Sequence, residues 1–121
     1  MRSIKFRAWD TKNKKMIYNV GICSQASQPI IYNADDDTYN DIIGIPMQYI
    51  GITDKNGRDV YEGDIYRSPY HKDGVYYKVE YDIDYCCYQL KYRQHIYKNI
   101  DMVEEYDYVG NCYENPEIEV K

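Results

Sequence analysis

The sequence predicts a mainly β protein, built as a compact barrel-like sheet of short antiparallel strands with at most one or two short helices. The first observation behind this prediction is composition, because 15 Ile, 7 Val and 17 Tyr stand against one Leu and three Ala. β-Branched and aromatic side chains fit a pleated surface, whereas Leu and Ala are the stronger helix formers. The second observation is the succession of short alternating segments divided by turn residues, which is typical of small barrels.

Each predicted element follows from a local pattern. Residues 75–83 give the longest polarity alternation in the chain, and Asp84-Tyr85 turns the chain into residues 86–93. Asn99 can cap one short helical turn over residues 101–105. The predicted strands are, in order, residues 4–10, 16–20, 47–52, 60–61, 65–66, 75–83, 86–93 and 106–112.

The central segment, residues 47–66, contains the clearest turn signals. Residues 54–57 read Asp-Lys-Asn-Gly, in which Asp54 can accept hydrogen bonds from the turn backbone and Gly57 tolerates a positive φ. The sequence Glu62-Gly63-Asp64 then breaks the return strand. Two carboxylates beside one glycine can hold Mg²⁺ or do acid–base chemistry, but acidic side chains in this position more often bind turn backbone.

Charge is distributed unevenly along the chain. The first fifteen residues hold six basic side chains and one acidic side chain, which gives them a net charge of +5. Because the whole chain has a net charge of −5, the other 106 residues have a net charge of −10. An acidic body argues against general binding to nucleic-acid phosphates. Patches of opposite charge, together with many tyrosines of the kind found at interfaces, predict a homo-oligomer.

The cysteine and acidic residues give no signature of a disulfide framework or a metal site. The N-terminus carries no apolar leader and no run reaches membrane-spanning length, so we expect a cytoplasmic protein with reduced thiols. Cys86 and Cys87 point to opposite faces if they lie in a strand, and no His or Cys spacing suits zinc. The acidic loop Asp35–Asp37 lacks the glycine and distal glutamate of an EF-hand. We therefore predict no metal and no cofactor.

Three segments stand out as a set: IKFRAWD near the N-terminus, MQYIGITDKNGRDVYEGDIY in the middle and YVGNCYENPEI near the C-terminus. In this order and spacing they resemble the YopX family of small proteins from bacteriophages and prophages. Because the three segments span nearly the whole chain, we predict one YopX-like domain over residues 1–121. The resemblance implies a phage-encoded, mainly β protein of the bacterial cytoplasm that forms a homo-oligomer, and it brings no catalytic residues.

The chain shows no local signature of a catalytic nucleophile and base and no glycine-rich phosphate loop, so we predict a binding protein and not an enzyme. The predicted function is to bind and sequester a small anionic nucleotide-type signal and so to counter host defence. Aromatic side chains can stack on a base, and a few cations can hold a phosphate group. The predicted ligand-binding residues are Trp9, Tyr49, Tyr61 and Tyr113 for stacking, Asn115 for polar edges, and Lys5, Arg7 and Arg58 for phosphate.

Two other functions remain open from the sequence. The first is an acidic, tyrosine-rich protein–protein interaction module that blocks a host protein. The second is single-stranded nucleic-acid binding by stacking, which the acidic body opposes. Structural interpretations also compete at single residues, since Trp9 can lie under a loop and Asn115 can close the turn before Pro116.

Overall fold

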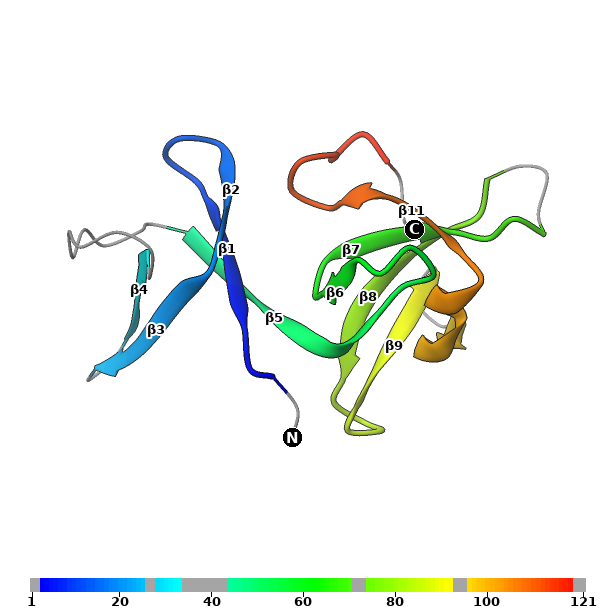
Figure 1. Ribbon diagram of the computed structural model, residues 1–121, viewed down its shortest axis with the longest axis horizontal. Helices are drawn as coiled ribbons and strands as arrows, with labels where there is room; N and C mark the ends of the chain where they lie inside the picture. The colour runs from blue at the N-terminus through cyan, green and yellow to red at the C-terminus, as the bar shows by residue number, and fades with distance from the viewer. Residues whose placement is uncertain (1–2, 26–27, 34–43, 71–73, 93–95, 119–121) are drawn as a thin grey trace. The chain divides into compact units, whose positions relative to one another are not determined.

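The computed structural model describes residues 3–25, 28–33, 44–70, 74–92 and 96–118. The acidic loop Asp35–Asp37, His71 and His95 lie outside these residues. The chain divides into two compact units, Met1–Tyr49 and Ile50–Lys121 (Figure 1). Among the described residues, no helix is long and apolar enough to span a membrane.

The predicted fold class is confirmed: the protein is mainly β, and the strand pairs are antiparallel. One 3₁₀ helix, η1, is present among the described residues. The elements are β1 (Phe6–Asp10), β2 (Lys15–Tyr18), β3 (Val20–Gln25), β4 (Gln28–Asn33), β5 (Gly44–Thr53), β6 (Asp59–Tyr61), β7 (Asp64–Arg67), β8 (Tyr76–Asp82), β9 (Cys87–Tyr92), β10 (Ile96–Asn99), η1 (Ile100–Glu104) and β11 (Asp107–Asn111).

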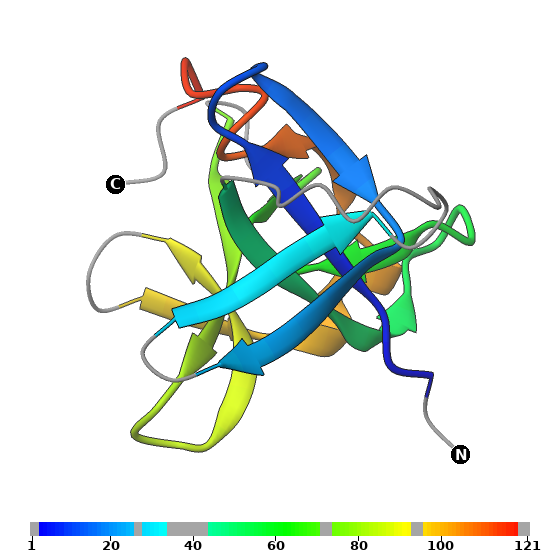
Figure 2. The same ribbon diagram turned by 90° about the vertical axis from the view of Figure 1, so that its left-hand side faces the viewer.

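In the first unit, β1 lies between β2 and β5, and β3 and β4 form a separate two-stranded ribbon (Figure 2). A small cluster of Ala8, Val20 and Ile31 fills this unit. Arg7, predicted from the sequence to bind phosphate, is completely buried on β1. Its neighbour Ala8 points to the other face of the strand and is also buried, so both faces of β1 are covered at this point.

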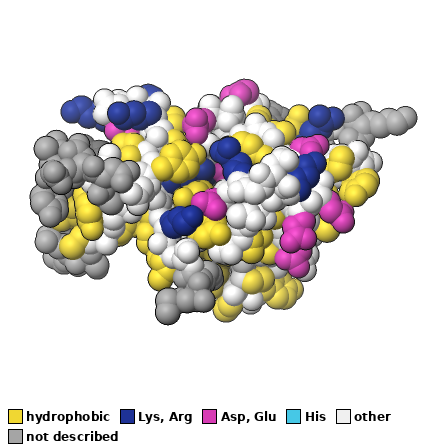
Figure 3. All heavy atoms as spheres, viewed as in Figure 1, with side chains coloured by type: hydrophobic (Ala, Val, Ile, Leu, Met, Phe, Trp, Pro, Cys, Tyr) yellow, Lys and Arg dark blue, Asp and Glu magenta, His cyan; other side chains and the backbone are white. Residues whose placement is uncertain are grey.

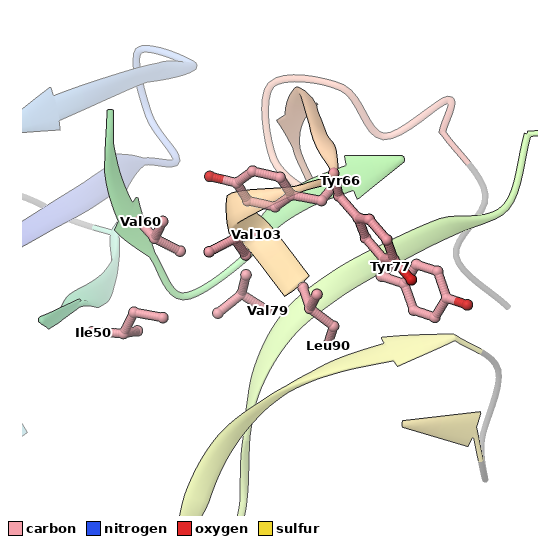
Figure 4. Close-up of a cluster of buried hydrophobic side chains, with 8 residues drawn as sticks. Ile50, Val60, Tyr66, Tyr77, Val79, Leu90 and Val103 are labelled. Carbon is pink, nitrogen blue, oxygen red and sulfur yellow. The ribbon is translucent and has the colours of Figure 1, made fainter. Parts of the chain in front are cut away.

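The second unit contains a five-stranded sheet in the order β10-β9-β8-β7-β11. One face of this sheet is apolar, because the alternation along β8 directs Tyr77 and Val79 to the same side as Leu90 of β9. Val103 of η1 packs into the same core, and the side chain of Asn99 accepts a hydrogen bond from the Asp101 amide as the predicted helix cap. Figure 4 shows this core, whose buried members are Ile50, Val60, Tyr66, Tyr77, Val79, Leu90, Val103 and Tyr106.

Buried polar side chains close the turns within the segments that resemble the YopX family. Asp10 accepts hydrogen bonds from the amides of Lys12 and Asn13 and from the Asn13 side chain. Asp54 accepts from the amides of Asn56 and Arg58, as the central turn predicted. Such contacts replace water for donors that the turn leaves without a backbone partner.

Buried side chains also accept hydrogen bonds from backbone amides in the two later turns. Asp64 is fully buried and accepts a hydrogen bond of 2.8 Å from the Tyr61 amide, so the turn interpretation of Glu62-Gly63-Asp64 is the one observed for this carboxylate. Asn111, at the end of β11, accepts from the amides of Tyr113 and Glu114. The polar residues of these segments therefore hold the backbone in place.

Candidate functional site

Four of the predicted ligand-binding residues belong to the first unit. The Lys5 ammonium lies 4.8 Å from the ring centroid of Tyr49, which is 8% exposed. The buried Arg7 guanidinium lies 5.9 Å from the Tyr18 ring, directly across the strand pair. Trp9 is half-buried on β1. Cation–π contacts thus already engage both predicted cations of this unit.

The other four predicted residues belong to the second unit. The Arg58 guanidinium stacks 3.7 Å from the ring centroid of Tyr108, and Tyr61 is only 5% exposed. The Asn115 side-chain oxygen accepts a hydrogen bond of 3.2 Å from the Asn111 amide. Asn115 therefore closes the C-terminal turn, which is the structural alternative that the sequence left open for it.

A cluster of charged side chains in the second unit lies on the polar face of β8, β9 and β10, opposite the apolar core. The strand register determines which side chains of this face are neighbours: Lys78 pairs with Lys91, and Glu80 pairs with Gln89. On the other side of β9, Tyr97 pairs with Lys91 and Asn99 with Gln89. We call this surface the polar sheet face, and its members are Lys78, Glu80, Gln89, Lys91, Tyr97 and Asn99.

Two lysines share one carboxylate on the polar sheet face. The Lys78 ammonium lies 2.7 Å from one Glu80 oxygen, and the Lys91 ammonium lies 3.3 Å from the other. The three side chains are 29–34% exposed. Each ammonium carries three N–H donors, so both keep donors for an additional anion. The trio also carries a net positive charge within an acidic protein.

The ion pairs set the protonation of this trio. Partial burial raises the pKa of Glu80, but the hydrogen bonds and charges of Lys78 and Lys91 outweigh burial and leave that pKa below its usual value. Partial burial lowers the pKa of Lys78, and the hydrogen bond and charge of Glu80 outweigh it in turn, leaving the pKa raised. Lys78 and Glu80 are therefore both charged at neutral pH.

Tyr113, one of the predicted stacking residues, lies beside this face. The Cys112 amide donates to the Gly63 carbonyl, and the Gly63 amide donates to the Val79 carbonyl, which brings the turn after β11 next to β8. Burial is the main cause that raises the pKa of Tyr113, and the charge of Lys78 acts in the opposite direction. Tyr113 therefore lies near enough to Lys78 for the lysine charge to affect its pKa.

Sequence reasoning missed the lysine pair, although a signal was present. The predicted turn at Asp84-Tyr85 places residues equally distant from it opposite each other, which pairs Lys78 with Lys91 as observed. Charged residues that alternate along a strand are usually solvated, so the polarity pattern alone did not single out these two lysines.

Replacing Glu80 by glutamine should lower the free energy of unfolding at pH 7 by about 0.5–1 kcal/mol, because two lysines then face each other without a counter-charge. Since the pKa of Glu80 is lowered by folding, its contribution is present above the unfolded pKa of about 4.3 and is lost as pH falls through the folded value. Urea titrations across pH should therefore show the two proteins converging in acid. Glu104→Gln, at an exposed position, is the control, and a gap that persists below the folded pKa would contradict the assignment.

The profile of the family described as YopX protein matches residues 5–118. The chain belongs to the YopX family. This confirms the resemblance drawn from the three sequence segments. Among the described residues, no group of three or more His, Cys, Asp or Glu side chains is arranged to hold a metal ion.

Two solved structures share the fold of this YopX family member. The crystal structure of protein EF1440 from Enterococcus faecalis has a TM-score of 0.62 and 23% identity, with 97% of this chain and 98% of that chain covered. The crystal structure of yopX from Bacillus subtilis has a TM-score of 0.64 and 17% identity, with both chains covered completely. At these identities the similarity establishes the fold alone. No curated protein matches the chain.

Proposed function

We propose that this protein binds a small anionic ligand of the nucleotide type on the polar sheet face. The observation that carries the proposal is the pair of half-buried lysines, Lys78 and Lys91, held opposite each other with Glu80 as their shared counter-ion. Like charges directly opposite on neighbouring strands destabilise a sheet. A phosphate group beside the ammonium groups would accept further charge-assisted hydrogen bonds from both, because Glu80 does not use all of their donors.

Aromatic side chains flank the lysine pair. Tyr97 of β10 lies across from Lys91 and is 40% exposed, and Tyr113 approaches from the turn after β11. Stacking of a nucleobase on one tyrosine ring contributes about 1–3 kcal/mol of binding free energy, whichever base it is. An anionic group with an aromatic ring attached therefore fits this face better than an inorganic anion.

Gln89 supplies a polar group for the edge of such a ring. It lies between Glu80 and Asn99 on this face, and its side-chain oxygen is buried and receives no hydrogen bond within the described residues. A buried acceptor in this state costs about 1–3 kcal/mol, and a rotation of the Gln89 amide that brought its oxygen to a donor on the ligand edge would recover that cost. Gln89 thus takes the role that the sequence analysis gave to Asn115.

The biological use of such a site follows from the family resemblance. A phage or prophage protein in the bacterial cytoplasm gains from removing a nucleotide-derived signal of host defence. The acidic body, which carries −10 outside the first fifteen residues, disfavours long polynucleotides while leaving a local pair of cations available. The protein therefore acts as a non-enzymatic sink for the signal.

The test is a thermal-shift and calorimetry series with mono-, di- and cyclic nucleotides and ADP-ribose derivatives. A ligand present at 100 times its dissociation constant should stabilise the wild-type protein by about 2.7 kcal/mol. Lys78→Gln with Lys91→Gln should weaken binding at least about tenfold, because both charged donors are lost.

Lys98→Gln is the matched control, since Lys98 is an exposed lysine of the same sheet that points to the opposite side and should bind the ligand as wild type does. If no compound stabilises the wild-type protein and none is released when protein from infected cells is denatured, the proposal fails. The protein-inhibitor function then takes its place.

A further inference from the structure

Two hairpin ends of this protein are built on the same backbone frame. In the β1–β2 hairpin, Asp10 pairs with Lys15 and its side chain accepts from the amides two and three residues later. In the β8–β9 hairpin, Asp82 pairs with Cys87 and its side chain accepts from the amides of Asp84 and Tyr85. Both four-residue loops end on a residue with positive φ, Lys14 at 56° and Cys86 at 54°.

The two ends present opposite surfaces on this shared frame. The β1–β2 end exposes Lys12, Lys14 and Lys15, and Figure 3 shows dark blue basic side chains gathered over that turn. The β8–β9 end exposes Asp84 at the position that corresponds to Lys12 in the loop, and it adds large apolar side chains. Ile83 is 79% exposed and Tyr85 is 74% exposed.

Apolar side chains this exposed and this close together are unusual on a monomer surface. The end is also ordered in advance: two hydrogen bonds from the loop backbone to Asp82 hold it, and Tyr81 packs edge-on against Tyr88 with ring centroids 5.2 Å apart. A preformed surface loses little conformational entropy when a partner binds. The β8–β9 end is therefore suited to docking.

We infer that the β8–β9 end of one copy docks onto the β1–β2 end of a second copy. Charge complementarity selects this occupant, because the lysines of the second copy match Asp84 and carry long aliphatic stems that can cover Ile83. A lysine ammonium over the exposed face of Tyr85 adds a cation–π contact. Hairpin ends are small surfaces, so the association should be weak, in the micromolar range.

Sedimentation velocity from about 1 to about 200 μM tests this interface at low and high salt. The wild-type protein should rise above the monomer mass of 14.5 kDa as concentration increases, and salt should weaken the association. Ile83→Ser with Tyr85→Ser should weaken it at least about tenfold, as expected when the apolar centre of an interface is removed. Ile4→Ser is the matched control, because Ile4 is 73% exposed elsewhere and should leave association unchanged.

A mixing experiment identifies the two surfaces as partners. Asp84→Lys alone, and Lys12→Glu with Lys14→Glu alone, should each lose self-association through like-charge repulsion. An equimolar mixture should recover it, because the lysines of the first variant face the Asp84 of the second. All of these positions are exposed, so far-UV circular dichroism and the melting temperature should stay near wild type.

Three results would overturn the inference. One is a wild-type protein that remains at 14.5 kDa throughout the concentration range. Another is association that survives the Ile83 and Tyr85 changes, and the third is a mixture that stays monomeric. If the monomeric wild type instead binds a host protein through Ile83 and Tyr85, the end is a docking surface for a different occupant and the self-association is wrong.

Discussion

Leu90→Ala should lower the free energy of unfolding by about 3–4 kcal/mol, which makes it one of the two most damaging single changes considered in this protein. Leu90 is the single leucine of the chain and is fully buried at the centre of the second unit's core. It lies opposite Val79 across β8 and β9. Truncation removes the transfer free energy of the side chain and leaves a cavity that close-packed neighbours fill only in part.

Urea denaturation followed by far-UV circular dichroism measures this loss. Lys98→Ala is the matched control, since Lys98 pairs with Leu90 across β9 and β10 but is exposed, and it should change stability by no more than about 0.5 kcal/mol. If Leu90→Ala lowered the free energy of unfolding by less than about 1 kcal/mol, the buried position of Leu90 in the core would be wrong.

The same variant tests the single domain predicted from the sequence. Trp9, the single tryptophan, lies in the first unit, whereas Leu90 lies in the second. If the chain unfolds as one cooperative domain, Trp9 fluorescence and circular dichroism should shift by the same amount in Leu90→Ala. A fluorescence transition that stays at the wild-type midpoint would show that the two units unfold independently.

The elements that sequence reasoning placed correctly are those whose signal is local. Asp54 and Gly57 define a turn through their own chemistry, and the structure shows the Gly57 amide bonded to the Asp54 carbonyl with Gly57 at φ 77°. Asn99 likewise caps η1 through a contact two residues away. Interactions of this range depend on few residues, so a short sequence window contains them.

The features that were missed depend on contacts distant in sequence. Arg7 alternates with apolar neighbours as a half-exposed strand residue would, but it is completely buried, with its guanidinium 5.9 Å from the Tyr18 ring of β2. The β3–β4 ribbon covers Val20–Gln25 and Gln28–Asn33, and the sequence predicted no strand between residues 20 and 47. Strand propensity depends strongly on context, so these two strands are recognised by their pairing with each other.

The candidate site illustrates the same limit. The predicted residues were chosen by type, as aromatics and cations, and the structure places Tyr61 and Tyr49 in buried positions and gives Asn115 to a turn. Lys78 and Lys91 come together only through strand register, which brings residues from separate strands opposite each other. Of the predicted set, Tyr113 lies near Lys78.

Asp54→Ala should cost about 3–4 kcal/mol of the free energy of unfolding, an effect comparable to that of Leu90→Ala. The Asp54 carboxylate is buried at the central turn and accepts hydrogen bonds from the amides of Asn56 and Arg58 and from the Tyr66 hydroxyl. Its removal leaves these donors without their acceptor, and a buried unsatisfied donor costs about 1–3 kcal/mol.

The hydrogen bond from the Tyr66 hydroxyl to Asp54 can be tested separately from the turn amides. Burial raises the pKa of the Tyr66 hydroxyl, and the negative charges of Asp64 and Asp54 raise it further, so the hydroxyl stays protonated and donates to Asp54 at 3.0 Å. Tyr66→Phe removes only this one hydrogen bond and should cost about 1–2 kcal/mol. Because the two groups are in direct contact, the double variant should be less destabilised than the sum of the single losses by about 1 kcal/mol.

Urea denaturation of Asp54→Ala, Tyr66→Phe and the double variant completes this cycle. Glu104→Ala, an exposed acidic residue of η1, should stay within about 0.5 kcal/mol of wild type and so controls for the loss of one negative charge. Asp54→Asn keeps one acceptor oxygen for the turn amides and should fall between wild type and Asp54→Ala. Strictly additive losses in the cycle, or an Asp54→Ala protein as stable as the Glu104 control, would mean that the central turn holds without its carboxylate.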